Sequence, residues 1–238
     1  MIIEVCCSNI FSVQNAQKAN VDRIELCSEL SLSGITPSFG FINKALKTGM
    51  NLHCLIRPRS GGFIYREEEL EIMYNDIEMI QSMGCNGIVV GALNPDLTIN
   101  EKAIKKMVRL ASSMEVTFHR AIDLVEDPFR LLSILMNLGV DRVLSSGQKS
   151  SAIEGLKTLI KMKDFAGDRI TIMPGGGINS ENCMVFKKAG FEAIHFSAFR
   201  AYEKKERSSI MSSLFDQALG ESDIEEIHKI KDCLQSKS

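Results

Sequence analysis

The most restrictive feature of the sequence is a repeated alternation between short β-rich apolar runs and longer stretches with helical spacing. Successive runs start roughly 20–36 residues apart, which leaves room for the helical crossover that joins parallel strands. The runs cover Ile2–Cys6, Arg23–Cys27, Leu52–Arg57, Gly87–Gly91, Val116–His119, Arg142–Ser145, Ile170–Met173 and Ala193–Phe196. Eight βα units predict an α/β fold, a (β/α)8 barrel. A doubly wound open sheet is the alternative, but such sheets usually have fewer strands.

The last of these units is irregular. A polar, charged stretch over Ala201–Ser209 follows the eighth run and is expected to be a mobile loop. A final helix is expected over Asp223–Leu234. No linker or composition break appears earlier, so residues 1–238 are predicted to form a single barrel domain, with 201–238 as a charged loop and terminal helix.

Charge and cysteine content exclude several classes of function. The chain has 28 basic and 30 acidic residues, a formal charge of −2, so no basic excess exists to bind nucleic acid or an anionic membrane. Its apolar runs are shorter than the roughly 18 residues of a spanning helix, and Glu4 interrupts any signal peptide. Seven cysteines, an odd number, are expected to be reduced thiols in a cytoplasmic protein.

Alternation within the runs predicts which side chains point into the barrel. A barrel strand presents aliphatic residues to the helices, as Ile3 and Val5 would, and its alternate residues point inward. The expected inward set is mostly polar: Glu4, Cys6, Arg23, Glu25, Cys27, His53, Leu55, Arg57, Thr117, His119, His195 and Ser197. Barrel interiors are usually filled by Val, Ile and Leu, so this set predicts a site at the carboxyl ends of the strands. A structural network in which Arg23 and Arg57 hold Glu4 and Glu25 is the alternative.

Two cysteines end neighbouring runs in the same context, Glu4-Val5-Cys6 and Glu25-Leu26-Cys27. Because neighbouring strands lie about 4.8 Å apart, Cys6 and Cys27 are expected to converge at the barrel mouth, whereas Cys7 faces the helices. Two thiolates are a soft ligand pair that favours Cu(I) over hard cations. The alternative is that these cysteines act only as small apolar residues.

Candidates for anion binding follow several runs. Arg57 and Arg59 belong to a Pro- and Gly-containing turn, and a guanidinium is a planar fork suited to phosphate or carboxylate. Barrel phosphate sites often lie after strands seven and eight, where Asn179 or Ser180 is expected to cap a helix. The small residues and histidine expected there are Ser146, Gly147, Gly175, Gly176, Gly177, His195 and Ser197. Plain turns are the alternative, and the glycine spacing does not match a dinucleotide fingerprint.

The fifth run ends in His119-Arg120-Ala121-Ile122-Asp123. An imidazole with a pKa of about 6.5 can act as a general acid or base, and a nearby carboxylate can fix its tautomer. If the barrel is an enzyme, the candidate catalytic residues are Glu4, Glu25, His119 and Asp123. A core histidine bonded to its neighbours is the alternative.

Taken together, these motifs resemble the CutC family. The segments that carry the resemblance are EVCCS at 4–8, DRIELCS at 22–28, TPSFG at 36–40, RPRSGGF at 57–63, TFHRAID at 117–123, RVLSSGQKS at 142–150, PGGGI at 174–178 and HFSA at 195–198. The resemblance implies a TIM barrel, a cytoplasmic location, self-association as a dimer or tetramer, and copper homeostasis with Cu(I) held by Cys6 and Cys27. Gly62 and Leu32 stand where the family commonly has acids, which removes two carboxylates from the expected mouth.

Two functions are therefore expected. The first is a copper homeostasis protein that binds Cu(I) through Cys6 and Cys27. The second is an enzyme acting on a small phosphate- or carboxylate-bearing metabolite by acid–base chemistry, in which Arg57 and the glycine loop hold the anion and His119 moves protons with an acid. No Ser-His-Asp order is evident, so proton abstraction suits the residues better than nucleophilic hydrolysis. The resemblance favours copper, and the residues alone slightly favour an anion-binding barrel.

Overall fold

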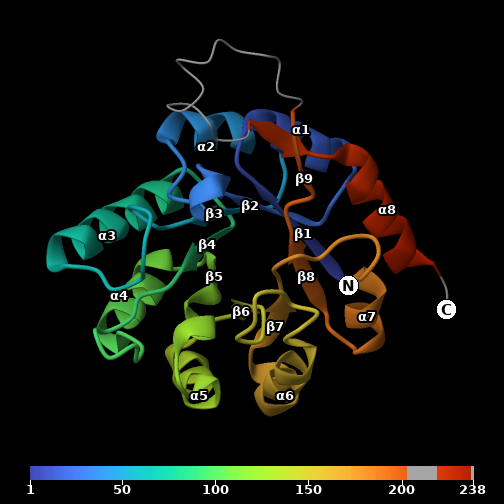
Figure 1. Cartoon of the computed structure of the whole chain (residues 1–238). Helices are drawn as coiled ribbons and strands as arrows, with labels where there is room; N and C mark the ends of the chain where they lie inside the picture. The colour runs from blue at the N-terminus through green and yellow to red at the C-terminus, as the bar shows by residue number, and fades with distance from the viewer. Residues whose placement is uncertain (203–218, 237–238) are drawn as a thin grey trace, which may run out of the picture.

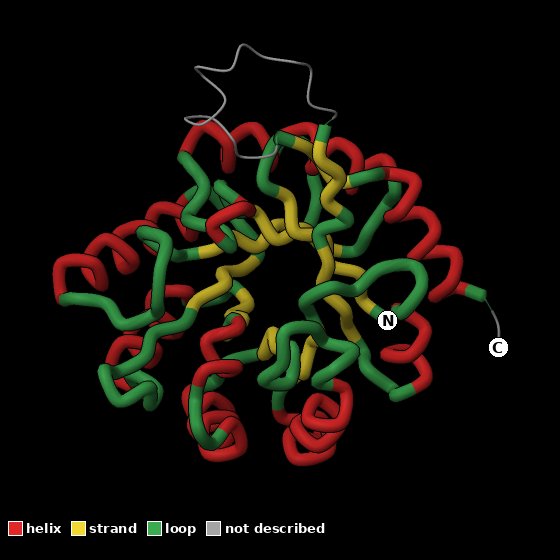
Figure 2. Tube along the Cα trace, viewed as in Figure 1, coloured by secondary structure: helices red, strands yellow, loops and turns green. Residues whose placement is uncertain are grey.

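A ring of eight parallel strands with helices around it forms the body of the molecule (Figures 1 and 2). The computed structural model describes residues 1–202 and 219–236. The strands are β1 (Ile2–Cys7), β2 (Arg23–Leu26), β3 (Leu52–Leu55), β4 (Gly87–Val90), β5 (Glu115–Phe118), β6 (Arg142–Ser145), β7 (Thr171–Pro174) and β8 (Ala193–Phe196). The outer helices are α1 (Ile10–Lys18), α2 (Phe39–Leu46), α3 (Glu67–Ser82), α4 (Glu101–Ala111), α5 (Pro128–Leu138), α6 (Leu156–Ala166) and α7 (Cys183–Lys188).

The strand order confirms the predicted barrel. Hydrogen-bonded neighbours run β7-β6-β5-β4-β3-β2-β1-β8, all parallel. Among the described residues, β7 and β8 are joined by one isolated bridge, between Gly175 and His195. The ring therefore closes at a seam that has fewer backbone hydrogen bonds than the other strand pairs.

The last unit is irregular, as predicted. After β8 the chain forms β9 (Phe199–Ala201), which pairs antiparallel with β10 (Gly220–Ser222). The terminal helix α8 (Ile224–Gln235) then packs beside α1 and α7, and Asp223 caps it by accepting a hydrogen bond from the N–H of Glu225. The expected loop over 201–209 falls largely outside the described residues.

Helix α5 begins and ends at residues that favour helix caps. The Asp127 carboxylate accepts hydrogen bonds from the N–H groups of Phe129 and Arg130, and Pro128 occupies the first helical position. Gly139 ends the helix with a φ of 78°, a backbone conformation that costs glycine little.

Helix α7 starts later than predicted. Its N-cap is Asn182 and its first residue is Cys183, so neither Asn179 nor Ser180 caps it. The Asn179 side chain instead accepts hydrogen bonds from the N–H groups of Glu181 and Asn182, which makes a turn ahead of the helix. Asparagine forms such turns readily, and a turn competes with helix initiation.

Contacts within the core confirm the predicted alternation of inward and outward residues. Outward residues such as Val5, Cys7 and Ile24 belong to the large apolar cluster between sheet and helices. Inside the ring lie two small apolar groups, one of Cys6, Cys27, Leu55 and Val89 and one of Leu144, Met173 and Ala193. The polar interior residues Glu4, Arg23, Glu25, His53, Arg57, Thr117, His119 and Arg142 are buried with them.

Two glycines of the fourth βα unit make room for buried histidine rings. A Cβ on Gly87 would lie 2.4 Å from the His53 ring, and a Cβ on Gly91 would lie 2.3 Å from Cε1 of His119. Real Cβ atoms do not approach that closely, so these positions require glycine while the rings stay in place.

Candidate functional site

A cavity of about 470 Å³ opens at the carboxyl ends of the strands, and most predicted site residues meet in it. The predicted residues that line it are Cys6, Glu25, Cys27, Arg57, His119, Asp123, Gly176, Gly177, His195 and Ser197. A second hollow, of about 810 Å³, lies on the outer surface between α3 and α4 and contains no predicted site residue. The cavity at the barrel mouth is therefore the candidate site.

The two strand-end thiols lie side by side at this mouth. The Cys6 and Cys27 sulfurs are 3.6 Å apart, and both residues are buried beside Leu55 and Val89. Register sets this contact, because the N–H of Cys27 donates to the carbonyl of Cys7 and so aligns the end of β2 with that of β1. The hydrogen bond with Cys27, together with burial, raises the pKa of the Cys6 thiol. No disulfide is present, and all seven cysteines are free.

A chain of charged side chains runs from below the cavity to its wall. Arg23 donates from Nε to a carboxylate oxygen of Glu4, and the other Glu4 oxygen lies 2.7 Å from Nδ1 of His195. The second ring nitrogen of His195, Nε2, lies 3.2 Å from Oε2 of Glu25. His195 thus links a buried ion pair below the cavity to a carboxylate that lines it.

The pKa directions along this chain follow from the pairing. Burial disfavours the charged form of Glu4, but the hydrogen bond from His195 and the charge of Arg23 outweigh it and hold the pKa of Glu4 well below its usual range. Burial raises the pKa of Glu25. Burial lowers the pKa of His195, yet Glu25 and Glu4 on its two sides raise it overall. Glu25 and His195 therefore both hold protons more tightly than they would in water.

His119 is held as a neutral ring. Burial lowers its pKa to about 3, and the positive charge of Arg57 acts in the same direction. The N–H of Ala121 donates to Nδ1 at 3.2 Å, so the ring proton belongs on Nε2, which has no hydrogen-bond acceptor among the described residues. Phe63 packs against the ring, with centroids 4.4 Å apart. His119 can donate a hydrogen bond to a ligand, but it is a weak base near neutral pH.

Arg57 lines the cavity but directs its terminal nitrogens at the loops. Nη1 donates to the carbonyls of Leu32 and Gly34, and Nη2 donates to the carbonyl of Gly61, at 2.6–2.8 Å. The structural alternative that paired Arg57 with Glu4 or Glu25 is therefore wrong, because the guanidinium binds backbone carbonyls instead. Of the two arginines in that alternative, Arg23 is the one that holds Glu4.

Five predicted residues do not line the cavity. Glu4 lies below it, in the chain described above. Arg59 projects outward and pairs with Glu69 on α3, while its Nη1 donates to the carbonyl of Gly62. The remaining three are Ser146, Gly147 and Gly175, which lie in the loops after β6 and β7.

Asp123 anchors the loop after β6. Its carboxylate accepts from the Ser145 and Ser146 hydroxyls and from the N–H groups of Ser146 and Gln148. These bonds hold the loop, and Nε of Arg120 donates a further hydrogen bond to the Asp123 carboxylate at 2.9 Å. A carboxylate with so many partners fits a structural role better than the catalytic role predicted for Asp123. That catalytic role remains a prediction.

Sequence reasoning missed several charged partners. Glu115 at the start of β5 receives a hydrogen bond from Arg142, lies 3.7 Å from Nη1 of Arg23 and 3.5 Å from Nε2 of His53. Applying the same alternation of inward and outward residues to the sixth run would have placed Arg142 and Leu144 on the inner face. Arg120 also lines the cavity, with Nη1 next to Gly176, where a Cβ would lie 3.3 Å away.

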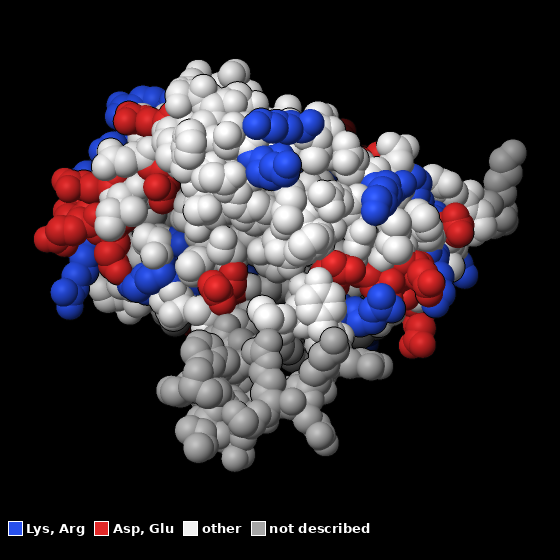
Figure 3. Space-filling view, turned by 90° about the horizontal axis from the view of Figure 1, so that it is seen from above, with Lys and Arg blue, Asp and Glu red and all other residues white. Residues whose placement is uncertain are grey.

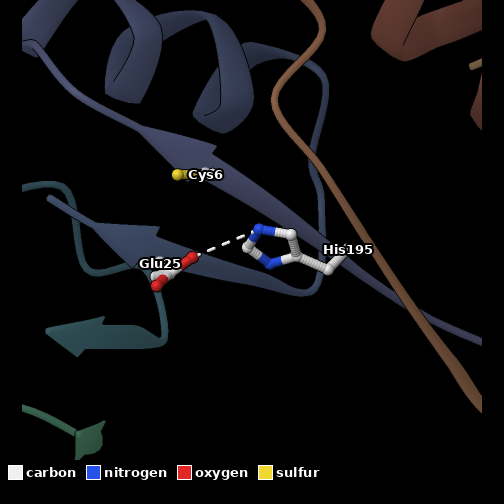
Figure 4. Close-up of side chains that lie close together, drawn as sticks. All are labelled: Cys6, Glu25 and His195. Atoms are coloured by element: carbon white, nitrogen blue, oxygen red, sulfur yellow. Dashed lines mark ion pairs between the residues drawn. The ribbon is translucent and has the colours of Figure 1, made fainter. Parts of the chain in front are cut away.

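Three side chains of types that can bind a metal converge on the cavity wall. Potential ligand atoms of Cys6, Glu25 and His195 all lie within 4.8 Å of one another. Figure 4 shows these side chains meeting from β1, β2 and β8. With Cys27 beside them, the site offers two sulfur donors, one imidazole and one carboxylate.

Charged side chains do not form a single-sign field on the face shown in Figure 3. Acidic and basic residues mix at its flanks, and a few basic residues lie in the broad area between them. Among the described residues, no helix combines the length and apolarity needed to cross a bilayer. The mixed charges agree with the near-neutral composition.

The fold is a (β/α)8 barrel, and two thiols line the cavity at its mouth. The chain belongs to the CutC family, whose family model matches residues 1–200. It is 38% identical to a family protein CutC of Glaesserella parasuis serovar 5, over 99% of this chain and 98% of the relative. It is 40% identical to the copper homeostasis protein cutC homolog of Homo sapiens, over 83% and 73% of the two chains.

A solved structure agrees with this assignment. The crystal structure of CutC from Streptococcus agalactiae superposes with a TM-score of 0.78 at 30% identity, covering 83% of this chain and 98% of that chain.

Proposed function

We propose that this protein binds Cu(I) through Cys6 and Cys27 at the barrel mouth and serves copper homeostasis. The observation that carries the proposal is the 3.6 Å separation of two free thiols that both line an open cavity. Soft sulfur ligands select Cu(I) over hard cations. The human relative is named as a copper homeostasis protein, which supports the same cargo here.

Cu(I) must displace thiol protons before it can bind. The pKa of Cys6 is raised by its hydrogen bond with Cys27 and by burial, so the free site is protonated at neutral pH. Because thiolates are the metal-binding form, we expect the affinity for Cu(I) to increase as the pH rises.

The chain contains a matched control for this site. Cys54 and Cys85 have sulfurs 3.8 Å apart, but they belong to the outer apolar cluster and do not line the cavity. Competition against a colourimetric Cu(I) chelator should show that Cys6→Ala/Cys27→Ala no longer takes Cu(I), while Cys54→Ala/Cys85→Ala competes like the wild type. Equal competition by the first variant and the wild type would overturn the proposal.

A second candidate function is acid–base catalysis on a small phosphate- or carboxylate-bearing metabolite. The observation that favours it is the Glu4–His195–Glu25 chain, in which both cavity-lining groups have raised pKa values. Glu25 and His195 would exchange a proton with a carbon next to a carbonyl, and neutral His119 would donate a hydrogen bond to the carbonyl oxygen. Arg120 beside Gly176 would attract the anionic group.

Solvent exchange tests this second function. In D2O, the wild type should introduce deuterium beside the carbonyl of at least one compound in a panel of small phosphorylated and carboxylated carbonyl compounds, measured by proton NMR. Glu25→Gln should abolish the exchange, and Glu69→Gln on α3 should retain it. No exchange on any compound would remove this candidate.

We further propose that the protein is cytoplasmic and self-associates as a dimer or tetramer. Free, mostly buried cysteines suit a reducing compartment. Phe11 on α1 and Phe39 on α2 are 56% and 58% exposed, and α1 and α2 lie along the top of Figure 1. Light scattering after size-exclusion chromatography should give a multiple of 26.4 kDa that Phe11→Asp/Phe39→Asp reduces. A wild-type monomer would refute self-association.

A further inference from the structure

The donors at the cavity wall fit a second metal ion of different chemistry. We propose that Cys6, Glu25 and His195 form a Zn2+ site that shares the Cys6 thiol with the Cu(I) pair. Zinc accepts sulfur, imidazole nitrogen and carboxylate oxygen together. Cu(I) selects the sulfurs, whereas carboxylate suits harder ions, so Glu25 belongs to a zinc set and not to a copper set.

The distances in this group are close to those that a zinc ion requires. A tetrahedral Zn2+ with bonds of about 2.0–2.3 Å holds its donors about 3.3–3.8 Å apart. Nε2 of His195 and Oε2 of Glu25 are already 3.2 Å apart, and the whole group spans no more than 4.8 Å. A contraction of about 1 Å therefore suffices to coordinate the ion.

Glu4 orients the imidazole for this role. Its carboxylate lies 2.7 Å from Nδ1 of His195 and is itself held by Arg23, so the Nδ1 proton has a fixed acceptor. That arrangement leaves Nε2 as the nitrogen that faces Glu25 and Cys6 (Figure 4). Histidines that bind zinc usually donate their other ring N–H to a carboxylate in this way, which fixes the tautomer of the ring.

Three protein ligands leave one position of a tetrahedral zinc open toward the cavity. Zinc sites that act on a ligand keep such a position for water or substrate. The zinc site shares one ligand, the Cys6 thiol, with the proposed copper site, and it does not require that copper binds. Zn2+ and Cu(I) would exclude each other at Cys6, while Cys27 serves copper alone and His195 and Glu25 serve zinc alone.

Four single variants separate the two metals. In competition with chromophoric chelators, His195→Gln and Glu25→Gln should each weaken Zn2+ binding by more than about 100-fold and leave Cu(I) binding unchanged. Loss of a residue that only hydrogen-bonds to a metal ligand costs about 10–100-fold, so a larger loss indicates direct coordination. Cys27→Ala should do the reverse, and Cys6→Ala should lose both ions. Glu69→Gln, at a residue that does not line the cavity, should match the wild type for both.

Wild-type protein provides a test that does not depend on how the variants fold. X-ray absorption of the zinc-loaded chain should show one sulfur and two or more nitrogen or oxygen neighbours. Two sulfurs without nitrogen, absent zinc binding, or unchanged zinc affinity in both His195→Gln and Glu25→Gln would each overturn the zinc site. If the wild type binds Zn2+ but not Cu(I), the copper function would be overturned and the zinc site would stand.

Discussion

Replacing Glu4 by glutamine tests whether the buried charged chain stabilises the barrel. The Glu4 carboxylate is fully buried between Arg23 and His195. Glutamine keeps the shape of the side chain but removes the closest ion pair of Arg23 among the described residues, and leaves the half-exposed Glu115 at 3.7 Å. Removing one partner of a buried ion pair costs about 3–5 kcal/mol. Since the total stability of a domain is about 5–15 kcal/mol, urea unfolding at pH 7 should show a large loss.

The loss should depend on pH in a defined direction. The pKa of Glu4 is below its ordinary value of 4.5, because His195 and Arg23 outweigh the effect of burial. A carboxylate whose pKa is lower in the folded state adds stability above the unfolded pKa and loses it as the pH falls toward the folded pKa. The difference between the wild type and Glu4→Gln should therefore be fully present at pH 7 and shrink below pH 4.5.

Glu115→Gln is the matched control for this experiment. It removes the same charge from the same network, but the Glu115 side chain is 48% exposed and its ion pairs are screened by water. We expect a loss of about 1 kcal/mol or less. A loss under about 1 kcal/mol for Glu4→Gln, or equal losses for the two variants, would refute the reasoning that burial makes this pair important.

Three further predictions concern other features of the barrel. In chemical denaturation, Gly91→Ala should lower the free energy of unfolding by about 1–3 kcal/mol because its Cβ would meet the His119 ring. Gly40→Ala on α2, where a Cβ would meet open space, should be neutral or stabilising in the same assay. Arg57→Ala should lower the melting temperature by orphaning three loop carbonyls, while Arg59→Ala, at a 41% exposed side chain, should change it little. In NMR titrations of the histidines, His119 and His53, with pKa values of about 3 and about 4, should stay neutral from pH 8 to 5. The pKa of His195 should instead be raised above its ordinary value by the carboxylates of Glu25 and Glu4. Protonation of His119 between pH 8 and 5 would contradict the burial argument.

The barrel and its inner face could be predicted from the sequence because both depend on short-range periodicity. Alternation within each strand alone assigns Glu4, Cys6 and Glu25 to the interior. The meeting of Cys6 and Cys27 was expected because each follows a Glu at the end of neighbouring strands; the register pairs Cys6 with Glu25, so the two thiols meet diagonally. These inferences needed only the strand period and the order of the strands.

The partners of long side chains could not be predicted in the same way. Arg57 reaches carbonyls at Leu32, Gly34 and Gly61, in two separate loops whose shapes depend on tertiary packing. Helix α7 starts late because the Asn179 side chain forms a turn instead of capping the helix. Asparagine is common in both positions, so the sequence alone does not distinguish them.

The seam between β7 and β8 has a consequence for how the molecule opens. A closed sheet exchanges its amide hydrogens first where the fewest backbone bonds hold it, and here that place is beside Gly175 and His195. His195 is also the residue that reaches across to carboxylates on β1 and β2. A ligand that immobilises this imidazole would make opening of the β7–β8 seam less frequent. Ligand binding at the barrel mouth should therefore be measurable as slower hydrogen exchange of the β8 amides.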